Sequence, residues 1–437
     1  MALLRKSFTQ CISNRGLDRV LSQIRLNSSY EIVIAGGGSG GISVGARLSN
    51  ALGSGKVAII EPSDDHYYQP IWTLVGAGVK PMSSSRKAMK DVIPSKATWI
   101  KDSVAKLNPD EKSVTLSNGD TISYKYLVVA MGIQLHFDRI KGLPEAFETP
   151  GVCSNYSAAT VGKTLKALKN FKEGNAIFTF PNTPIKCAGA PQKIMYLADE
   201  FFRKQGNRDK AHIYFNSAGA AIFAVKKYAE ALNKIVASRD ITANYGLNLV
   251  EVKPDKKQAI FAKMSNPEEK ETFDYEMLHI TPPMAAPAPI RDSPLSNEAG
   301  FVNVDSKTLQ HTKYPEVFAL GDCSSLPTSK TAAAVACQNK ILATNLLSYR
   351  ENLPRSATYD GYTSCPLITS SKTCIMAEFD YDLNPLETFP VNQAKERRTM
   401  YHVKATGLPI VYWNMMLKGR WGGPKFYRKL LHLGMSK

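Results

Sequence analysis

A glycine-rich turn between an apolar run and a helix-forming stretch constrains this chain most strongly. It lies in YEIVIAGGGSGGISVGARLSN, where Ile32–Ala35 reads as a buried parallel strand. Gly36, Gly38 and Gly41 follow at G-x-G-x-x-G spacing, and a helix is expected after them. The first glycine permits a tight turn, the second admits a pyrophosphate, and the third allows close helix–strand packing. This pattern predicts a dinucleotide-binding α/β domain.

The next strand supports this interpretation. KVAIIEP ends in Glu61, about twenty residues after Gly41, which is the usual spacing in this motif. The carboxylate can accept hydrogen bonds from a ribose diol, and its charge would repel a 2′-phosphate. A glycine-rich turn in an unrelated α/β protein is the alternative, but strand, glycines, helix and acid all agree here.

A second cofactor element separates a flavin from a nicotinamide dinucleotide. The expected strand Leu127–Ala130 runs into the turn at Gly132, and the strand Val317–Leu320 runs into Gly321 and Asp322. A carboxylate at a strand end can accept hydrogen bonds from the ribityl hydroxyls of FAD. The alanine-rich stretch that begins at Thr331 predicts a helix whose N-terminus stabilises negative charge on a reduced flavin. These features predict FAD as the resident cofactor.

The middle of the chain reads as a second nucleotide-binding fold in which the phosphate loop is replaced. NAIFTF and AHIYFN are expected strands, and APQKIMYLADEFFRK and AVKKYAEALNKI are expected helices. Where a glycine loop for NADH should follow NAIFTF, the chain has PNTPIKCAGAPQK, with Cys187 inside it. We therefore expect electrons to enter through sulfur rather than nicotinamide.

A two-electron sulfur couple needs a second thiol. The chain has seven cysteines and no C-x-x-C, so neither a zinc-type spacing nor a dense disulfide framework is present. Cys365, in YDGYTSCPLITSSKT, lies in a strand-like segment and is the first candidate partner for Cys187. Cys153, Cys323 and Cys374 remain alternatives, since a single buried cysteine usually serves as a small apolar side chain. Lys186 is a neighbouring cation that would favour a thiolate.

Charge is concentrated at both ends of the chain. The net charge is +17, which favours anionic surfaces or substrates. Residues 1–29 carry five basic side chains against Asp18 alone, together with several serines, and predict a mitochondrial transit peptide rather than a disordered basic tail.

The C-terminal end is basic and aromatic. No acid follows Glu396, and the stretches LPIVYWNMML and FYRKLLHLGM are short and amphipathic. This pattern is typical of helices that lie in a membrane interface, and packing of the apolar residues on the core is the alternative. No nucleic-acid-binding signature is present. No run of 18 apolar residues occurs, so no membrane-spanning helix is expected.

Taken together, these stretches resemble the mitochondrial-type sulfide:quinone oxidoreductases, within the flavoproteins that have two dinucleotide-binding domains. The resemblance covers nearly all of residues 30–437. It rests on the segments already quoted and on HYYQPIWTLVGAG, YEMLHITPPM, VFALGDCSSLPTSKTAAAVA and YWNMMLKGRWGGPKFYRKLLHLGMSK.

The resemblance implies a reaction and its participants. Hydrogen sulfide would be oxidised to sulfane sulfur, and two electrons would pass through FAD to ubiquinone. The family's redox cysteines fall on Cys187 and Cys365, joined at rest by a disulfide or trisulfide. Cys187 would face the flavin and Cys365 would carry the persulfide, which glutathione or sulfite accepts. The enzyme would sit peripherally on the inner mitochondrial membrane, with FAD bound non-covalently and Cys153 outside the chemistry.

The expected fold is therefore α/β, with two Rossmann-like domains and a C-terminal amphipathic membrane-associating region. The boundaries are residues 30–150 with 300–350 for the FAD domain, 151–299 for the second domain and 351–437 for the C-terminal region. No metal is expected. The residues expected to bind FAD are Gly36, Gly38, Gly40, Gly41, Glu61, Gln69, Val104, Ala130, Gly132, Asp322, Lys330 and Thr331.

Three other functions compete with this interpretation. A type II NADH:quinone oxidoreductase would share the cofactor, the fold and the membrane tail, but it needs the missing second glycine loop. A non-catalytic flavoprotein would not need both cysteines. A persulfide carrier that does not use quinone would not need the aromatic and basic tail.

Overall fold

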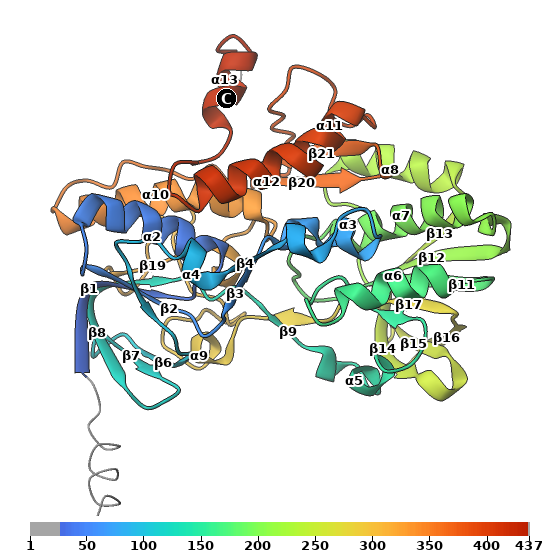
Figure 1. Cartoon of the computed structure of the whole chain (residues 1–437), viewed down its shortest axis with the longest axis horizontal. Coiled ribbons are helices and arrows are strands. Elements are labelled where there is room, and N and C mark those ends of the chain that lie inside the picture. The colour runs from blue at the N-terminus through green and yellow to red at the C-terminus, as the bar shows by residue number, and fades with distance from the viewer. Residues whose placement is uncertain (1–26, 436–437) are drawn as a thin grey trace, which may run out of the picture.

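A computed structural model describes residues 27–435 of the chain. Two α/β units lie side by side, and the C-terminal helices cover one edge of both (Figure 1). The predicted transit segment falls mainly on residues outside those described, and its cleavage point remains a prediction. The α/β fold with two Rossmann-like units is confirmed, whereas the exact domain boundaries remain predictions.

The first unit is built on a sheet of order β5-β2-β1-β8-β7-β6, with β19 added beside the end of β8. β1, β2, β5, β8 and β19 pair in parallel, and β6, β7 and β8 form an antiparallel meander. The side chains of Ile32–Ala35 are completely buried, as their uniformly apolar sequence predicts for a strand covered on both faces. The bounds are β1 Asn27–Ala35, β2 Val57–Ile60, β5 Thr98–Ile100, β6 Val104–Asn108, β7 Ser113–Leu116, β8 Thr121–Val129 and β19 Val317–Ala319. The helices α2 (Ser39–Leu52) and α10 (Ala332–Arg350) pack against each other over this sheet.

The second unit has a fully parallel sheet of order β10-β17-β11-β12-β13. Its strands are β10 Val152–Cys153, β11 Gly174–Phe180, β12 Ala211–Ser217, β13 Ile241–Tyr245 and β17 Met277–His279, with helices α6 Val161–Asn170, α7 Ala190–Gln205 and α8 Lys226–Ser238. The expected order of strand, helix, strand and helix in this part of the chain is confirmed. An antiparallel sheet of β14 (Leu247–Lys253), β15 (Gln258–Lys263) and β16 (Lys270–Asp274) lies beside it.

Short elements connect and cover these units. The pair β9–β18 bridges them, and β3–β4 lies near the start of α3 (Figure 1). Their bounds are β3 Asp65–Tyr67, β4 Arg86–Ala88, β9 Gln134–Leu135, β18 Met284–Ala285, α3 Trp72–Gly76, α4 Met89–Val92, α5 Leu143–Ala146 and α9 Ala288–Arg291.

The C-terminal region begins with an antiparallel hairpin of β20 (Thr363–Ile368) and β21 (Cys374–Phe379). A helical run follows, in which α11 (Arg398–His402) and α12 (Leu408–Val411) alternate with π-helical segments at Val403–Gly407 and Tyr412–Met416. Wide π turns of this kind frequently occur at functional sites. Finally, α13 (Lys425–Leu431) projects from the body (Figure 1).

The two predicted amphipathic stretches behave differently. In the first, Tyr412 is buried, and its hydroxyl lies 2.7 Å from the Ser39 hydroxyl and 2.6 Å from Nε2 of His66. This stretch therefore packs on the flavin unit, beside the start of α2. In the second, Phe426 is 70% exposed and Leu430 is 61% exposed. None of the helices within residues 27–435 is both long and apolar enough to cross a bilayer.

Candidate active site

The glycine turn has the geometry that its sequence predicts. Gly36 adopts φ +103°, and a Cβ there would lie 2.5 Å from the carbonyl oxygen of Ala130. A Cβ on Gly41 would lie 1.8 Å from the Gly36 oxygen, whereas the space beside Gly38 is open to 4 Å. Gly36 and Gly41 are therefore required by close packing, and Gly38 leaves its backbone accessible to a ligand. Gly40 packs near Leu320.

Glu61 is tied to this turn. Its Oε2 accepts a hydrogen bond from the Gly37 N–H at 2.8 Å, and its Oε1 accepts one from the Ser63 N–H at 2.9 Å. The carboxylate is thus held at the end of β2, and each oxygen keeps a lone pair that a ribose diol can use.

Two further predicted residues lie at the turn, and two others stand apart from it. Ala130 follows β8 directly against Gly36, and Gly132 turns the chain with φ +69°. Gln69 accepts a hydrogen bond from Lys186 Nζ at 2.7 Å, so it joins the flavin unit to the cysteine loop. Val104 opens β6 with its side chain buried in the core, so only its backbone is available to a ligand.

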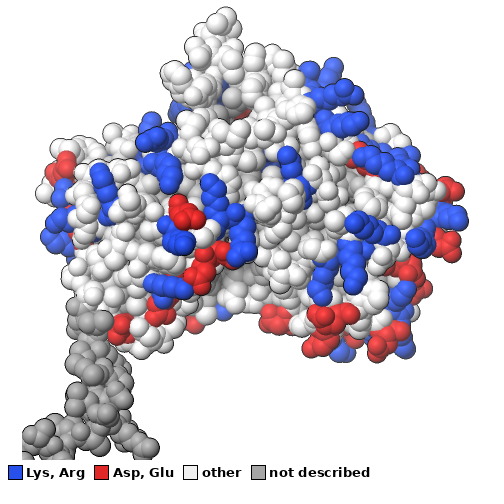
Figure 2. Space-filling model, in the orientation of Figure 1, with Lys and Arg blue, Asp and Glu red and all other residues white. Residues whose placement is uncertain are grey.

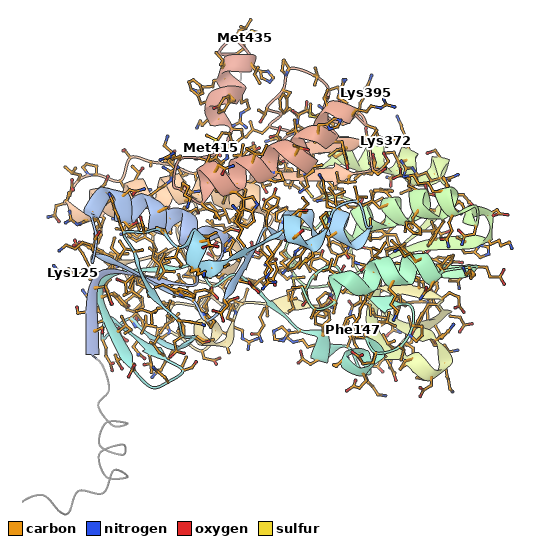
Figure 3. All side chains as sticks on the ribbon, viewed as in Figure 1. Lys125, Phe147, Lys372, Lys395, Met415 and Met435 are labelled. Atoms are coloured by element: carbon orange, nitrogen blue, oxygen red, sulfur yellow. The ribbon has the colours of Figure 1, made fainter. Side chains whose placement is uncertain are left out.

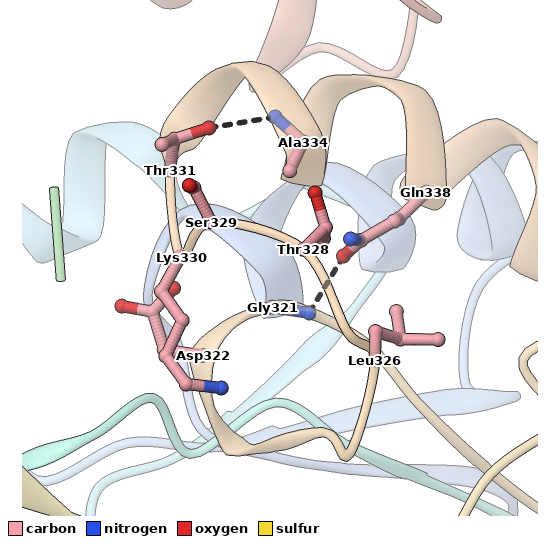
Figure 4. Close-up of a pocket in the computed structure, with 9 residues that line it drawn as sticks. All are labelled: Gly321, Asp322, Leu326, Thr328, Ser329, Lys330, Thr331, Ala334 and Gln338. Atoms are coloured by element: carbon pink, nitrogen blue, oxygen red, sulfur yellow. Dashed lines mark hydrogen bonds between the residues drawn. The ribbon is translucent and has the colours of Figure 1, made fainter. Parts of the chain in front are cut away.

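The second cofactor element forms a small pocket at the start of α10 (Figure 4). Thr331 caps this helix, with its Oγ1 accepting a hydrogen bond from the Ala334 N–H at 3.0 Å. Asp322 and Lys330 line the same pocket, and no hydrogen bond within the described chain satisfies the Asp322 carboxylate. Burial raises the pKa of Asp322, and the ammonium groups of Lys330 and Lys186 oppose this shift. A carboxylate without a partner can accept hydrogen bonds from the hydroxyls of a polyol chain. The N-terminus of the adjacent helix suits a ring that becomes negatively charged when it accepts electrons.

The cysteine loop between β11 and α7 is held in an unusual conformation. Cys187 has φ +53°, a region that non-glycine residues rarely adopt and that costs about 1 kcal/mol. Its N–H donates to the Lys330 carbonyl at 2.8 Å, and its own carbonyl accepts from the Ala190 N–H at 2.8 Å and from the Tyr156 hydroxyl at 3.3 Å. The loop is therefore fixed directly against the flavin pocket.

Cys365 reaches Cys187 from the C-terminal hairpin. It lies in the middle of β20, paired with Ala377, and is 2% exposed. The two sulfur atoms are 3.9 Å apart, in contact but not bonded. A Cβ on Gly189 would lie 2.5 Å from the Cys365 sulfur, so only glycine allows this approach. Among the candidate cysteines, the fold brings together the pair that the resemblance implied.

A buried lysine sets the charge of this pair. Lys193, on the first turn of α7, is 2% exposed and places Nζ 3.2 Å from the Cys187 sulfur. The hydrogen bond with Cys365, and then the charge of Lys193, hold the pKa of the Cys187 thiol well below its ordinary value. The same hydrogen bond and burial raise the pKa of Cys365 well above its ordinary value. Of the two thiols, Cys187 is therefore the more acidic.

Lys186, the lysine next to Cys187 in sequence, does not contact the thiol. Lys186 turns away to Gln69 and lies over the Trp72 ring at 5.5 Å. Lys193 contacts the thiol instead. Helical side chains lean toward the N-terminal end of their helix, and Cys187 lies at that end of α7. The helix predicted for APQKIMYLADEFFRK already places Lys193 in its first turn, so the sequence could have indicated this lysine.

The remaining described cysteines form no hydrogen bond with the sulfur atoms of Cys187 and Cys365, and they take packing positions. Cys153 is fully buried and donates to the Leu278 carbonyl at 3.7 Å, and Cys323 donates to the Val129 carbonyl at 3.5 Å. Cys374 is buried on β21, and Cys337 lies on α10 against Gly423. Within residues 27–435, no group of three or more histidine, cysteine or acidic side chains could hold a metal ion.

Comparisons with known proteins agree with this geometry. A family model described as pyridine nucleotide-disulphide oxidoreductase matches residues 30–172. The chain is 57% identical to the mitochondrial sulfide:quinone oxidoreductase of Mus musculus, over 93% of this chain and 90% of that protein. It is 49% identical to the protein of the same name from Dictyostelium discoideum, over 91% and 88%. The sulfide:quinone oxidoreductase structure from Aquifex aeolicus superimposes with a TM-score of 0.76 at 17% identity, covering 93% of this chain and 95% of that one, and thus shares the fold.

Proposed function

Because the chain belongs to the mitochondrial sulfide:quinone oxidoreductases, we propose that Cys187 and Cys365 are the thiols through which it oxidises sulfide and reduces ubiquinone. The observation that carries this assignment is the contact of the two sulfur atoms at 3.9 Å, with Lys193 Nζ 3.2 Å from one of them. A thiolate beside a thiol, with an adjacent cation, is suited to thiol–disulfide exchange.

The sulfur steps follow from the different acidities of the two thiols. With the cysteines joined as a disulfide, hydrosulfide attacks the Cys365 sulfur, the S–S bond breaks, and Cys187 leaves as the thiolate. The products are a persulfide on Cys365 and a thiolate on Cys187, so one negative charge enters and one remains. Cys187 suits the role of leaving group because its pKa is the lower of the two, and thiols of low pKa leave faster.

A nucleophilic acceptor then removes the outer sulfur of the persulfide. Attack by sulfite or by the thiolate of glutathione breaks the S–S bond of the Cys365 persulfide and releases the Cys365 sulfur as a thiolate. Both acceptors are anionic at the sulfur that reacts, and the lysines around the site favour their approach. In the same proposal, a resting state with an extra sulfur atom between Cys187 and Cys365 is the alternative to the disulfide.

When bound, FAD would supply the two-electron redox chemistry that links the sulfur pair to quinone. Gly36, Gly38, Gly40 and Gly41 would hold its pyrophosphate, and Glu61 would hold a ribose. Asp322 would receive the ribityl hydroxyls, with Lys330 and Thr331 at the start of α10. Gln69, Val104, Ala130 and Gly132 complete the cradle. We propose that FAD is held non-covalently, since Cys153 is completely buried on β10 of the second unit.

The loop after β11 argues against an NADH-dependent reaction. It contains Pro181, Pro184 and Cys187 where a second dinucleotide would need a glycine turn. The left-handed conformation at Cys187 is instead held by contacts with the flavin unit. A persulfide carrier that does not use quinone remains the second candidate function, and its test is quinone dependence.

An anaerobic titration tests the proposed function. Sulfide alone, added to the full-length flavoprotein, should bleach the flavin absorption, and a soluble ubiquinone analogue should restore it. NADH at the same concentration should have no effect. Bleaching by NADH but not by sulfide would assign the rival dehydrogenase activity, and bleaching by sulfide without recovery on quinone would favour the carrier.

We also propose that the C-terminal end of the protein binds the surface of the inner mitochondrial membrane. α13 projects beyond the body with Met435 near its tip (Figure 3), and the projection shows few charged side chains on the face in Figure 2. The exposed apolar side chains of α13 and of the residues that follow it are Phe426, Tyr427, Leu430, Leu431, Leu433 and Met435. Arg428 is buried instead and donates to the Leu386 carbonyl at 3.2 Å, which anchors the helix. This arrangement fits a short helix that inserts into one leaflet.

Removing the apolar side chains of α13 should release the protein from membranes. The variant Phe426→Ser/Leu430→Ser/Leu433→Ser should bind vesicles that contain cardiolipin at least about 100-fold more weakly, because each buried apolar side chain contributes about 1.5–3 kcal/mol. Flotation with liposomes measures this. The double variant Met264→Ser/Leu353→Ser removes side chains 44% and 56% exposed elsewhere and should bind as the wild type does. Equal binding of the triple variant would show that another surface makes the contact.

A further inference from the structure

Thr363 is a completely buried threonine on β20, two residues before Cys365. Successive side chains of a strand point to opposite faces, so Thr363 and Cys365 lie on the same face of the hairpin. The Thr363 hydroxyl donates to the Ser329 carbonyl at 3.3 Å and lies 2.9 Å from the Thr331 hydroxyl. Because a hydroxyl has a single proton, Thr331 donates in the second of these contacts. The strand that carries Cys365 is therefore hydrogen-bonded to the residues just before α10.

The segment Thr328–Thr331, which we call the bridging segment, also holds the Cys187 loop. Within it, the Lys330 carbonyl accepts a hydrogen bond from the Cys187 N–H at 2.8 Å. At its beginning, the Thr328 hydroxyl donates to the carbonyl of Gly361 at 3.0 Å, just before β20. Figure 4 shows the four residues of the bridging segment leading into α10. One short segment beside the flavin pocket thus contacts the backbone that carries each of the two cysteines.

The reacting pair depends on this arrangement because its two halves are far apart in the sequence. Cys187 and Cys365 are separated by 178 residues and lie in a loop and in a strand of different parts of the fold. A disulfide forms only when both backbones hold the two Cβ atoms within narrow limits. The sulfur atoms are 3.9 Å apart, and each cycle of exchange must bring them back together. A contact that fixes β20 against the Cys187 loop therefore raises the effective concentration of one thiol at the other.

We propose that Thr363 is a positioning residue, whose hydroxyl holds Cys365 against Cys187 through the bridging segment and thereby favours the disulfide over the dithiol. This inference rests on the proposed function, because it takes the same two cysteines as the reacting pair. Without the Thr363 hydroxyl, the Ser329 carbonyl and the buried Thr331 hydroxyl each lose a partner, and the contact that holds β20 in place is broken. The two sulfur atoms would then meet less often.

Replacing Thr363 tests the inference on the full-length flavoprotein. Thr363→Val keeps the branched shape without the hydroxyl, and Thr363→Ser keeps the hydroxyl. Thr369→Val is the matched control, because Thr369 is also completely buried, directly after β20, and its hydroxyl contacts Thr373 of the hairpin turn at 2.9 Å.

The readout is the thiol–disulfide equilibrium of Cys187 and Cys365 in anaerobic mixtures of reduced and oxidised dithiothreitol. The two thiols give two protons and two electrons to the oxidised reagent, whose S–S bond breaks as the S–S bond of the protein forms. Alkylation and mass spectrometry measure the linked fraction. The equilibrium constant for disulfide formation should fall about tenfold in Thr363→Val, which raises the reduction potential by about 30 mV. It should stay within about twofold of the wild type in Thr363→Ser and Thr369→Val. This measurement needs neither sulfide nor quinone.

An equilibrium constant that is unchanged or higher in Thr363→Val would overturn the inference. So would an equal fall in Thr369→Val, since that pattern assigns the effect to a weakened hairpin rather than to the bridging segment. If Thr363→Val does not fold, Thr363→Ala also lacks the hydroxyl and should show the same fall. If sulfide leaves the flavin of the wild type unbleached, the proposed function fails, while the disulfide equilibrium still decides on Thr363.

Discussion

Replacing either Cys187 or Cys365 with serine is expected to lower sulfide-dependent quinone reduction at least about a thousandfold. A serine hydroxyl is a far poorer nucleophile and leaving group than a thiol at neutral pH, and it forms no disulfide. Anaerobic stopped-flow absorbance of the flavin measures the loss. Flavin content should stay at the wild-type level, because neither side chain lies in the glycine turn or the Asp322 pocket.

Cys153→Ser is the matched control for both variants. Cys153 is buried and donates one weak hydrogen bond to a carbonyl, which a serine hydroxyl can also donate. Activity close to that of the wild type is expected. Full activity in Cys365→Ser, or a comparable loss in Cys153→Ser, would mean that the reactive pair has been assigned wrongly.

The flavin unit could be predicted from the sequence because its signal is local. The strand, glycine turn and helix of β1 and α2 lie within one short segment, and the backbone geometry of Gly36 and Gly41 follows from contacts inside that segment and with Ala130. Glu61 ends the next strand. Where a motif is completed within a few neighbouring elements, residue types and spacing are enough to predict it.

The sulfur site depends on contacts that spacing does not encode. Cys187 and Cys365 come from different units and meet only because the C-terminal hairpin folds back onto α7. Lys193 lies six residues after Cys187, and only the turn of α7 brings its Nζ to the thiol, whereas the adjacent Lys186 points to Gln69.

The C-terminal stretches show the same limit. Both are short, amphipathic and set in the acid-free segment after Glu396, so the sequence predicts the same role for each. Tertiary contacts separate them: the Tyr412 hydroxyl reaches Ser39 and His66, whereas Phe426 stays 70% exposed and Leu430 61% exposed. Amphipathic periodicity shows that a face will be buried but does not identify what buries it.

Replacing Lys193 with methionine is expected to move the acid limb of Cys187 alkylation in the reduced protein upward by about two pH units. The pKa of the Cys187 thiol is depressed, so its thiolate persists above that pKa and is lost as the pH falls through it. Without the ammonium at 3.2 Å the pKa rises, and at pH values below the original pKa about a hundredfold less thiolate remains. The pH dependence of iodoacetamide alkylation at Cys187 after reduction, followed by mass spectrometry, measures the shift.

Lys193→Arg separates charge from packing at the same position. The guanidinium keeps the positive charge, so the acid limb should stay within about half a pH unit of the wild type even if the longer side chain lowers the maximal rate. Burial opposes the charge on Lys193, yet interaction with Cys187 outweighs it and leaves the pKa of the lysine above its ordinary value. The pair is thus bound by mutual charge, and an acid limb that stays in place in Lys193→Met would mean that the hydrogen bond with Cys365 alone sustains the thiolate.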